Sequence, residues 1–357
     1  MSTRAGGVLD ALEHPIVQAP MGGGPGTPAL AAAVCEAGGL GFLSAGYQAV
    51  EAVRADVESL RGRTARPFGV NLFAPPGEAG DPGAVRRYAA ALGAEATRVG
   101  AAVGEARHHD DGWDEKLALA AELRVPVVST TFGCPSAAVV TDLHDAGCEV
   151  WVTVTTPGEA AAATAAGADA LVVQGVEAGG HRGSFDDAAS GDLGLLALLQ
   201  LVAAQGDLPL VASGGLATGR AVAAVLVAGA RAAQLGTAFM LTPEAATSAA
   251  HRAAIASPAP TALTRAFTGR TARGIVNRFL AEHDADAPSA YPEVHHVTAP
   301  LRAAARARGD ADAINLWAGQ AHPLAAEAPA GELVRRLSAE AREALAAAAG
   351  RPPDVAG

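Results

Sequence analysis

The chain of 357 residues is poor in aromatic side chains and in cysteine. Aromatic residues make up 4% of it although half of all residues are hydrophobic, so we expect a core built mainly from Ala, Val and Leu. Its three cysteines, Cys35, Cys134 and Cys148, are odd in number and form no C-x-x-C pair. This pattern argues against a disulfide framework and against a zinc site. We therefore expect a protein of a reducing compartment, the cytoplasm.

The chain also lacks an excess of basic residues and long apolar runs. Acidic residues outnumber basic ones 37 to 26, which gives a formal net charge of -11. A nucleic-acid partner would require clustered Lys and Arg to meet phosphates, so this class is not expected. The first fifteen or so residues carry no apolar run typical of a signal peptide, and later apolar stretches end before the ~20 residues of a membrane span. A membrane protein is not expected either.

Short β-rich segments recur along the chain, usually followed by turn residues and an Ala-rich helical stretch. Several are apolar without alternation, as strands covered on both faces should be. The pattern predicts the α/β class and a (β/α)8 TIM barrel, which takes ~250 residues; the chain up to about Thr242 supplies roughly that length. A six-stranded doubly wound sheet is the alternative. The expected strands are 14–19, 40–45, 68–73, 126–131, 149–155, 170–174, 208–213 and 232–237.

Two segments do not fit the repeat. Residues 86–123 are too many for one crossover and receive no assignment. Residues 243–315 follow the last expected strand and have weak strand signals and scattered helix, so we expect a smaller, mainly helical cap domain over the barrel mouth. Residues 1–242 and 316–357 would then form the barrel, with a C-terminal helix over 329–350.

Glycine-rich turns follow the seventh and eighth expected strands, where barrels often bind a phosphate. Residues 213–219 read SGGLATG and residues 234–237 read QLGT. Glycines there leave backbone amides accessible, and the N-terminus of the helix after the first turn favours an anion. Either turn alone could be an ordinary tight connection, but the two together favour a phosphate site.

The histidine with the clearest functional context is His181, in the sequence GVEAGGHRG of residues 175–183. It follows an expected strand within a glycine-rich loop, close to both phosphate turns. No ligand set at metal spacing surrounds it and no G-x-S-x-G motif is present, so neither zinc nor a serine hydrolase is expected. A base or hydrogen-bond donor that faces a cofactor is the better interpretation. We expect His14, His108, His109, His144, His251 and His283 to be structural or exposed.

Polar side chains at other strand ends have two interpretations. Gln18, Asn71 and Gln174 could hydrogen-bond a heteroaromatic ring at the barrel mouth, or they could simply bond to neighbouring backbone.

Several motifs together resemble the nitronate monooxygenase family, formerly called 2-nitropropane dioxygenases. They are PIVQAPMGGG (15–24), FGVNLF (68–73), QGVEAGGHRG (174–183), LVASGGLATGR (210–220), AAQLGTAFM (232–240), FTGRTARGIVNR (267–278) and LWAGQ (316–320). The resemblance runs over nearly the whole chain, in order. It implies an FMN-dependent barrel enzyme that oxidises small alkyl nitronates, such as propionate 3-nitronate, with O2 to carbonyl compounds and nitrite. A monomer and a homodimer both stay open.

The resemblance also implies the roles of particular residues. His181 falls on the family's active-site histidine. The isoalloxazine and ribityl groups would lie against one set, and the phosphate against another. The first set is Pro20, Met21, Gly22, Asn71, Gln174, Gly179 and Gly180; the second is Gly214, Gly215, Gln234, Gly236 and Thr237.

The alternative with the closest sequence pattern is the FMN-dependent enoyl-acyl-carrier-protein reductase, which shares the barrel, the Gly-Gly-His loop and the phosphate turns but uses NAD(P)H. The stretches RTARGIVNRF and LWAGQ favour the monooxygenase. A non-catalytic flavin-binding protein is a third possibility, against which the intact His181 loop argues.

Three arginines in the expected cap, Arg270, Arg273 and Arg278, would lie near the barrel mouth. A guanidinium can bond two oxygens of a nitro or carboxylate group at once, so these residues are candidates for substrate binding. They could also pair with acids on the surface.

Overall fold

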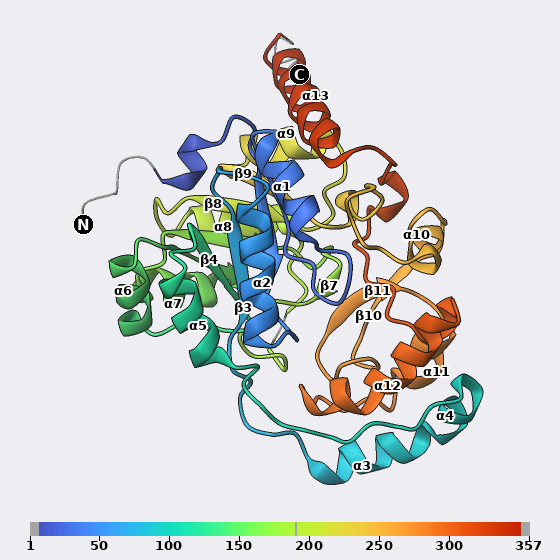
Figure 1. Cartoon of the computed structure of the whole chain (residues 1–357). Helices are drawn as coiled ribbons and strands as arrows, with labels where there is room; N and C mark the ends of the chain where they lie inside the picture. Colours follow the sequence, from blue (N-terminus) through green and yellow to red (C-terminus); the bar gives the residue numbers. More distant parts are fainter. Residues whose placement is uncertain (1–6, 190, 351–357) are drawn as a thin grey trace, which may run out of the picture.

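A closed barrel of eight parallel strands is the main feature of the computed structural model, which describes residues 7–189 and 191–350 (Figure 1). The strands follow one another around the barrel in chain order, and each lies within a predicted segment. The (β/α)8 prediction is confirmed, and the doubly wound sheet is ruled out. The barrel strands are β1 (Ile16–Gln18), β2 (Leu40–Ser44), β3 (Gly69–Phe73), β4 (Val127–Thr131), β5 (Glu149–Val154), β6 (Ala170–Gln174), β8 (Leu210–Ser213) and β9 (Ala232–Leu235).

Helices surround the barrel, and several of them begin at a side-chain cap. The hydroxyl groups of Thr27, Ser136, Thr156 and Thr218 each accept a bond from a first-turn amide, which satisfies a donor that the helix leaves free. The surrounding helices are α1 (Pro28–Glu36), α2 (Val50–Arg61), α5 (Trp113–Glu122), α6 (Ala137–Asp145), α7 (Pro157–Ala166), α8 (Leu195–Ala203) and α9 (Gly219–Val227). The C-terminal helix α13 (Ala330–Ala349) packs on α9 and α1 and projects from the barrel in Figure 1.

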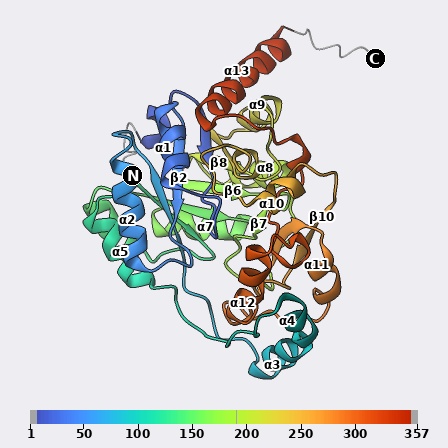
Figure 2. The same ribbon diagram turned by 45° about the vertical axis from the view of Figure 1, so that its right-hand side comes forward.

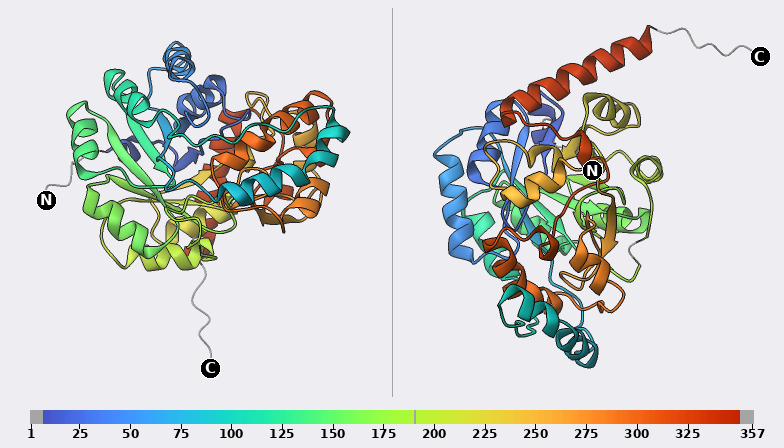
Figure 3. Two further views of the ribbon diagram at one scale, coloured as in Figure 1. Left: turned by 90° about the horizontal axis from the view of Figure 1, so that it is seen from below. Right: turned by 90° about the vertical axis from the view of Figure 1, so that its right-hand side faces the viewer.

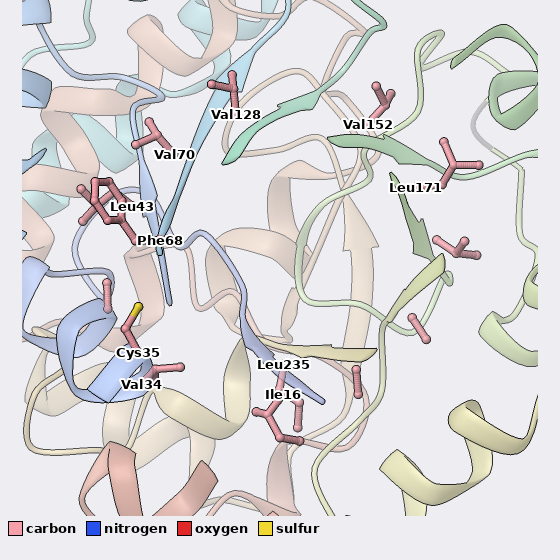
Figure 4. Packing of buried hydrophobic residues seen from close by; sticks show 14 of the residues in the cluster. Ile16, Val34, Cys35, Leu43, Phe68, Val70, Val128, Val152, Leu171 and Leu235 are labelled. Atoms are coloured by element: carbon pink, nitrogen blue, oxygen red, sulfur yellow. The ribbon is translucent and has the colours of Figure 1, made fainter. Parts of the chain in front are cut away.

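Alternation along the strands separates an inner from an outer set of side chains. The outer set packs against the helices in one large cluster, part of which Figure 4 shows around Val34 and Cys35 of α1. The inner set forms its own cluster, in which the rings of Phe42 and Trp151 lie 5.7 Å apart. Its other buried members are Val17, Leu40, Val127, Ala170, Val172, Val211 and Ala232, and the 3-10 helix η1 (Val8–Ala11) covers it from below.

The inward positions become polar two residues further along the strands. Phe42 is followed by Ser44, and Trp151 by Thr153. The same step leads to Asn71, Gln174, Ser213 and Gln234 on other strands, and all of these line one cavity. The barrel therefore has an apolar interior below and a polar floor at the carboxyl ends of its strands, where barrel enzymes place their chemistry.

A second hydrophobic cluster lies beside the barrel mouth. In the view from below in Figure 3, this part of the chain extends to one side of the barrel. Its helices are α10 (Ala249–Ile255), α11 (Arg278–His283), α12 (Glu293–Ala307), and also α3 (Pro82–Ala91) and α4 (Gly93–Val99). Residues 86–123, which the sequence left unassigned, thus leave the barrel. Their helices α3 and α4 pack against α12 (Figure 2), and the chain returns to the barrel as α5. The domain boundaries at residues 242 and 315 stay a prediction.

A three-stranded antiparallel sheet joins the two parts, and sequence reasoning did not predict it. Strands β10 (Thr261–Thr264) and β11 (Ala272–Ile275) form a pair, and β7 (Gly180–His181) adds to β11. The register places His181 opposite Ala272. The predicted active-site histidine is therefore part of a strand of this sheet rather than of a free loop. None of the described helices combines the length and the apolar character needed to cross a bilayer.

Candidate active site

One cavity at the carboxyl end of the barrel brings together His181 and every residue predicted for cofactor contact, whereas Gln18 and the three cap arginines lie outside its lining. The imidazole of His181 lies in its wall, together with all of the residues proposed for cofactor contact. These are Pro20, Met21, Gly22, Asn71, Gln174, Gly179, Gly180, Gly214, Gly215, Gln234, Gly236 and Thr237. The cap side of the cavity includes His251, Arg306, Asn315 and Trp317, which the sequence did not single out for this place.

The glycines before His181 let backbone approach backbone. A Cβ on Gly179 would lie 2.4 Å from the carbonyl carbon of Ala318 and from the amide of Gly319, so only glycine fits there. Gly180 has a φ of +76°, a conformation that L side chains rarely adopt. The side-chain amide of Gln174 then holds the loop, because its Nε2 donates to the carbonyl of His181 at 3.1 Å and its Oε1 accepts from the amide of Gly183 at 2.8 Å. Of the two interpretations of Gln174, contact with a cofactor ring and bonding to neighbouring backbone, the structure shows the second.

The hydrogen bonds of Thr268 determine which nitrogen of His181 carries the proton. The hydroxyl of Thr268 donates to the carbonyl of Arg270 at 3.1 Å and lies 3.0 Å from Nε2 of His181. A hydroxyl has one proton to donate, so Thr268 must accept from His181. We assign the Nε2–H tautomer on this basis, which leaves a lone pair on Nδ1.

The environment of His181 opposes a positive charge. Burial among protein groups lowers the pKa of His181 to about 3, and the nearby Arg270 guanidinium adds to this effect. Burial similarly lowers the pKa of His251 to about 4 and that of His295 to about 2. The imidazole in the cavity wall is therefore neutral at physiological pH.

Aromatic rings surround the imidazole in a chain that has few of them. The ring centroids of Phe132, Trp317, Tyr291 and Tyr47 lie 5.5, 5.7, 6.0 and 6.4 Å from that of His181. Sequence reasoning noted Trp317 only within the LWAGQ motif and missed the other three. The scarcity of aromatics was the available signal, because two of the three tyrosines in the chain lie here.

Two of these rings are held by strained backbone. Tyr47 and Phe132 have φ values of +65° and +77°, which bulky residues rarely adopt. The amide of Tyr47 donates to Oδ1 of Asp111 at 3.1 Å, and the buried Lys116 binds the other oxygen of that carboxylate at 2.7 Å. Such strain persists where the surroundings impose it, often at functional sites.

Two backbone amides in the cavity lining have no acceptor among the residues that the structure describes. Gly214 and Gly215 have φ values of +125° and +66°, and across residues 7–189 and 191–350 no acceptor bonds to either amide. Successive amides in such turns form concave sites for anions. The neighbouring hydroxyl of Thr237 accepts from the amide of Gly319 at 3.0 Å, which ties the second turn to the segment after Trp317.

The N-terminus of the helix after the first glycine turn already has an anionic partner in the protein. The first amide of α9, that of Gly219, donates to the Glu340 carboxylate of α13 at 3.0 Å, and the hydroxyl of Thr218 accepts from the amide of Ala221. A contribution of this helix end to a phosphate site stays a prediction, and the free amides of the glycine turn are the donors that the structure offers.

Asn71 offers a donor to the cavity. Its Oδ1 accepts from the hydroxyls of Ser129 at 2.9 Å and Thr131 at 3.0 Å. This leaves the Nδ2 group of the same side chain for a ligand in the cavity that it lines.

The three cap arginines do not line the cavity. Arg278 forms ion pairs with Glu95 and Glu282, each at 2.8 Å. These two carboxylates and His283 make up the only cluster of possible metal ligands among the described residues. Arg273 donates to the carbonyl of Val176 at 2.9 Å. Arg270 lies behind the wall, with its guanidinium 4.1 Å from the centre of the Phe132 ring. Pairing with protein groups is thus what these residues do.

Comparison with known proteins places the chain in a family. A model of the family described as nitronate monooxygenase matches residues 8–340. The chain is 45% identical to the nitronate monooxygenase of Pseudomonas aeruginosa, over 93% of this chain and 97% of that protein. The chain belongs to the nitronate monooxygenase family. A second nitronate monooxygenase, from Paraburkholderia phytofirmans, is 39% identical over 94% of each chain. Members named in this way are oxidoreductases, so this protein is an enzyme of that class.

Solved structures agree with this assignment. The nitroalkane oxidase of Streptomyces ansochromogenes superposes with a TM-score of 0.92 and 52% identity, covering 96% of this chain and 99% of that one. FabK from Thermotoga maritima is more distant, with a TM-score of 0.77 and 26% identity over 98% of this chain and 99% of that one. The enoyl reductase domain of MlnA from Bacillus amyloliquefaciens, at 12% identity, shares the fold alone.

The low pKa of His181 predicts how stability depends on pH. The pKa of this side chain is about 3 in the folded protein, against about 6.5 in an unfolded chain. Between these values the unfolded chain binds a proton that the folded chain does not, so the free energy of unfolding decreases as the pH falls. The variant His181→Asn lacks this loss, and urea unfolding between pH 6.5 and 4.5 should show a shallower decrease than in the wild type. An imidazole of His181 that titrates near pH 6.5 in NMR spectra of the folded protein would contradict this.

Proposed function

We propose that the protein is an FMN-dependent nitronate monooxygenase that oxidises small alkyl nitronates, such as propionate 3-nitronate, with O2 to carbonyl compounds and nitrite. The observation that carries the proposal is one cavity lined both by free backbone amides and by a neutral histidine within an aromatic wall. Membership of the nitronate monooxygenase family supports it. The three free cysteines fit a reducing compartment, and we place the enzyme in the cytoplasm, as a monomer or a homodimer.

The residues present fit FMN. The amides of Gly214 and Gly215 suit its phosphate, and Asn71 suits the heteroaromatic ring through its free Nδ2 group. Gly236 and Thr237 would complete the phosphate end. When bound, FMN would supply the electron acceptor for the substrate and the route by which electrons reach O2.

His181 would act on the substrate as a proton acceptor. Its Nε2–H is engaged by Thr268, so the lone pair on Nδ1 is the group that can take a proton from the carbon beside a neutral nitro group. The surroundings keep the imidazole uncharged before the reaction. The nitronate formed is an anion, which raises the pKa of an adjacent imidazole and stabilises the proton there. The new Nδ1–H could then donate to a nitronate oxygen.

An FMN-dependent enoyl-acyl-carrier-protein reductase that uses NAD(P)H is the alternative. The likeness to FabK supports it, but at 26% identity against 52% for the nitroalkane oxidase. We therefore favour the monooxygenase.

Replacing Gly215 by Ala should weaken FMN binding. A Cβ there would lie 3.0 Å from Cβ of Glu177 and would force a side chain onto a φ of +66°, which moves the amides that should hold the phosphate. Gly147→Ala is the matched control, because Gly147 also has a positive φ, +88°, but lies outside the cavity. Chromatography of the released cofactor should give about one FMN per wild-type or control chain and much less for Gly215→Ala. Release of FAD from the wild type, or an unchanged amount of FMN from Gly215→Ala, would contradict the phosphate assignment.

The variant His181→Asn should keep FMN but lose activity on neutral nitroalkanes. A positioned general base typically contributes ~10²–10⁴-fold to the rate. Nitronates, which are already deprotonated, should lose far less. The measurement is kcat/KM for a nitroalkane and for its nitronate with both proteins. An equal loss on the two forms would show that His181 positions the substrate and does not remove a proton.

A further inference from the structure

Lys116 is the only lysine among the 26 basic residues of the chain, and it is buried. Its side chain is 2% exposed and lies against an apolar pocket lined by Val53, Val57 and Val70. Lysine is almost never fully buried unless it is paired, and its Nζ binds Oδ2 of Asp111 at 2.7 Å. Removing two charges from water is costly, so the position of this pair calls for an explanation.

The other oxygen of Asp111 holds the backbone of a residue in the cavity wall. Oδ1 accepts from the amide of Tyr47 at 3.1 Å, the only bond of that amide among the residues that the structure describes, and Tyr47 lines the cavity. Burial raises the pKa of Asp111, and the ammonium of Lys116 opposes this effect. Lys116 thus favours the ionised carboxylate, the stronger acceptor, and leaves one of its oxygens for Tyr47.

The turn that carries Tyr47 needs such a contact. The φ of Tyr47 is +65°, which an aromatic residue rarely adopts and keeps only where its surroundings impose it. The backbone before it is tightly packed, because a Cβ on Gly46 would lie 2.2 Å from a ring carbon of Phe73. The bond from the Tyr47 amide to Asp111 is the polar contact that opposes relaxation of this turn.

The ring of Tyr47 is held by a helix to which the segment of Asp111 is tied. It stacks on the imidazole of His295 in α12, with the centroids 4.1 Å apart and the planes at 3°. Nε2 of His109 lies 2.7 Å from Nε2 of His296 on the same helix, and Nδ1 of His109 accepts from the amide of Asp111 at 2.9 Å. The backbone and the ring of Tyr47 are therefore fixed by two elements that contact each other.

A purely local role does not explain the pair. Asp111 precedes α5, but the N-terminus of this helix has no side-chain cap, so Asp111 does not serve as one. The packing of α5 on α2 has an ion pair of its own, because Arg54 of α2 binds Glu122 of α5 at 2.6 Å on the exposed surface. The bond that distinguishes Asp111 is the one to the cavity wall.

We propose that Asp111, fixed by Lys116, is a positioning residue that holds Tyr47 in the wall of the active-site cavity beside His181. Neither Asp111 nor Lys116 lines the cavity, so both act on the reaction through Tyr47, whose ring lies 6.4 Å from that of His181. The consequence for catalysis rests on the proposed function. The proposal also gives residues 86–123 a role, because their return to the barrel brings Asp111 against the turn after β2.

Hydrogen exchange of the Tyr47 amide in the FMN-loaded protein tests the contact without turnover. Two double variants, Lys116→Met with Asp111→Asn and Lys116→Met with Asp111→Gly, both remove the buried charges, and Asn and Gly both tolerate the φ of +61° at this position. Only the first keeps an oxygen for the Tyr47 amide. Exchange of this amide should become about tenfold faster in the second and stay within about twofold of the wild type in the first. The control Glu122→Gln, which loses an acid of α5 outside the cavity, should leave it unchanged.

Turnover of propionate 3-nitronate gives a second arm. The variant with Asp111→Gly should lose about tenfold in kcat/KM, and the variant with Asp111→Asn should recover most of it. In a Tyr47→Ala background the two should be equal, because residues that act through one side chain are not additive. Equal exchange of the Tyr47 amide in the two double variants would overturn the proposal, and so would a tenfold loss that persists without the Tyr47 ring. Should the wild type oxidise no nitronate, the proposed function fails, and the exchange of the Tyr47 amide decides the positioning contact by itself.

Discussion

The site depends on the backbone pairing between β7 and β11. Gly180 and His181 follow the sixth barrel strand, yet they bond to Arg273 and Ala272 of the smaller sheet. This pairing puts the imidazole within reach of Thr268 and so selects its tautomer. It also brings Gly179 against the backbone of Ala318 and Gly319. One short antiparallel contact thus joins the barrel, the cap and the segment that carries Trp317.

Exclusion of charge is the second constraint on the site. The cavity floor is made of amide and hydroxyl groups, its wall is aromatic, and the histidines His181 and His251 in its lining are kept neutral. In such surroundings a bond to a developing anion is stronger than in water. The free amides of Gly214 and Gly215 then offer positive potential within this cavity, and a bound phosphate matches this distribution.

The parts of the molecule that were predicted correctly are those specified by local pattern. The barrel strands are apolar runs bounded by turn residues, and all eight lie where this pattern placed them. The glycine turns at 213–219 and 234–237 were also visible in the sequence, and in the first of them Gly214 and Gly215 adopt the positive φ that glycine tolerates. His181 and the residues predicted for cofactor contact meet in one cavity, since parallel barrel strands end at one rim.

The features that the sequence did not predict depend on contacts between distant segments of the chain. The pairing of β7 with β11 joins residues about ninety positions apart and leaves no local signal in a two-residue strand. The same holds for α3 and α4, whose apolar faces are buried by α12. Arg278 was a candidate for substrate binding only because its partner Glu95, far away in sequence, could not be foreseen. Tyr47 and Phe132 reach His181 through strained backbone, which residue preferences argue against.

The central claim is that the cavity oxidises a nitronate with O2 and needs no nicotinamide. The most direct test measures oxygen uptake by the FMN-loaded protein with a nitronate alone, and separately the bleaching of its flavin absorbance by NADH or NADPH without oxygen. We expect nitronate-dependent oxygen uptake, and slow or no bleaching by either nucleotide. Fast anaerobic bleaching by NADH or NADPH, together with no oxygen uptake on addition of nitronate, would contradict the monooxygenase assignment in favour of a reductase.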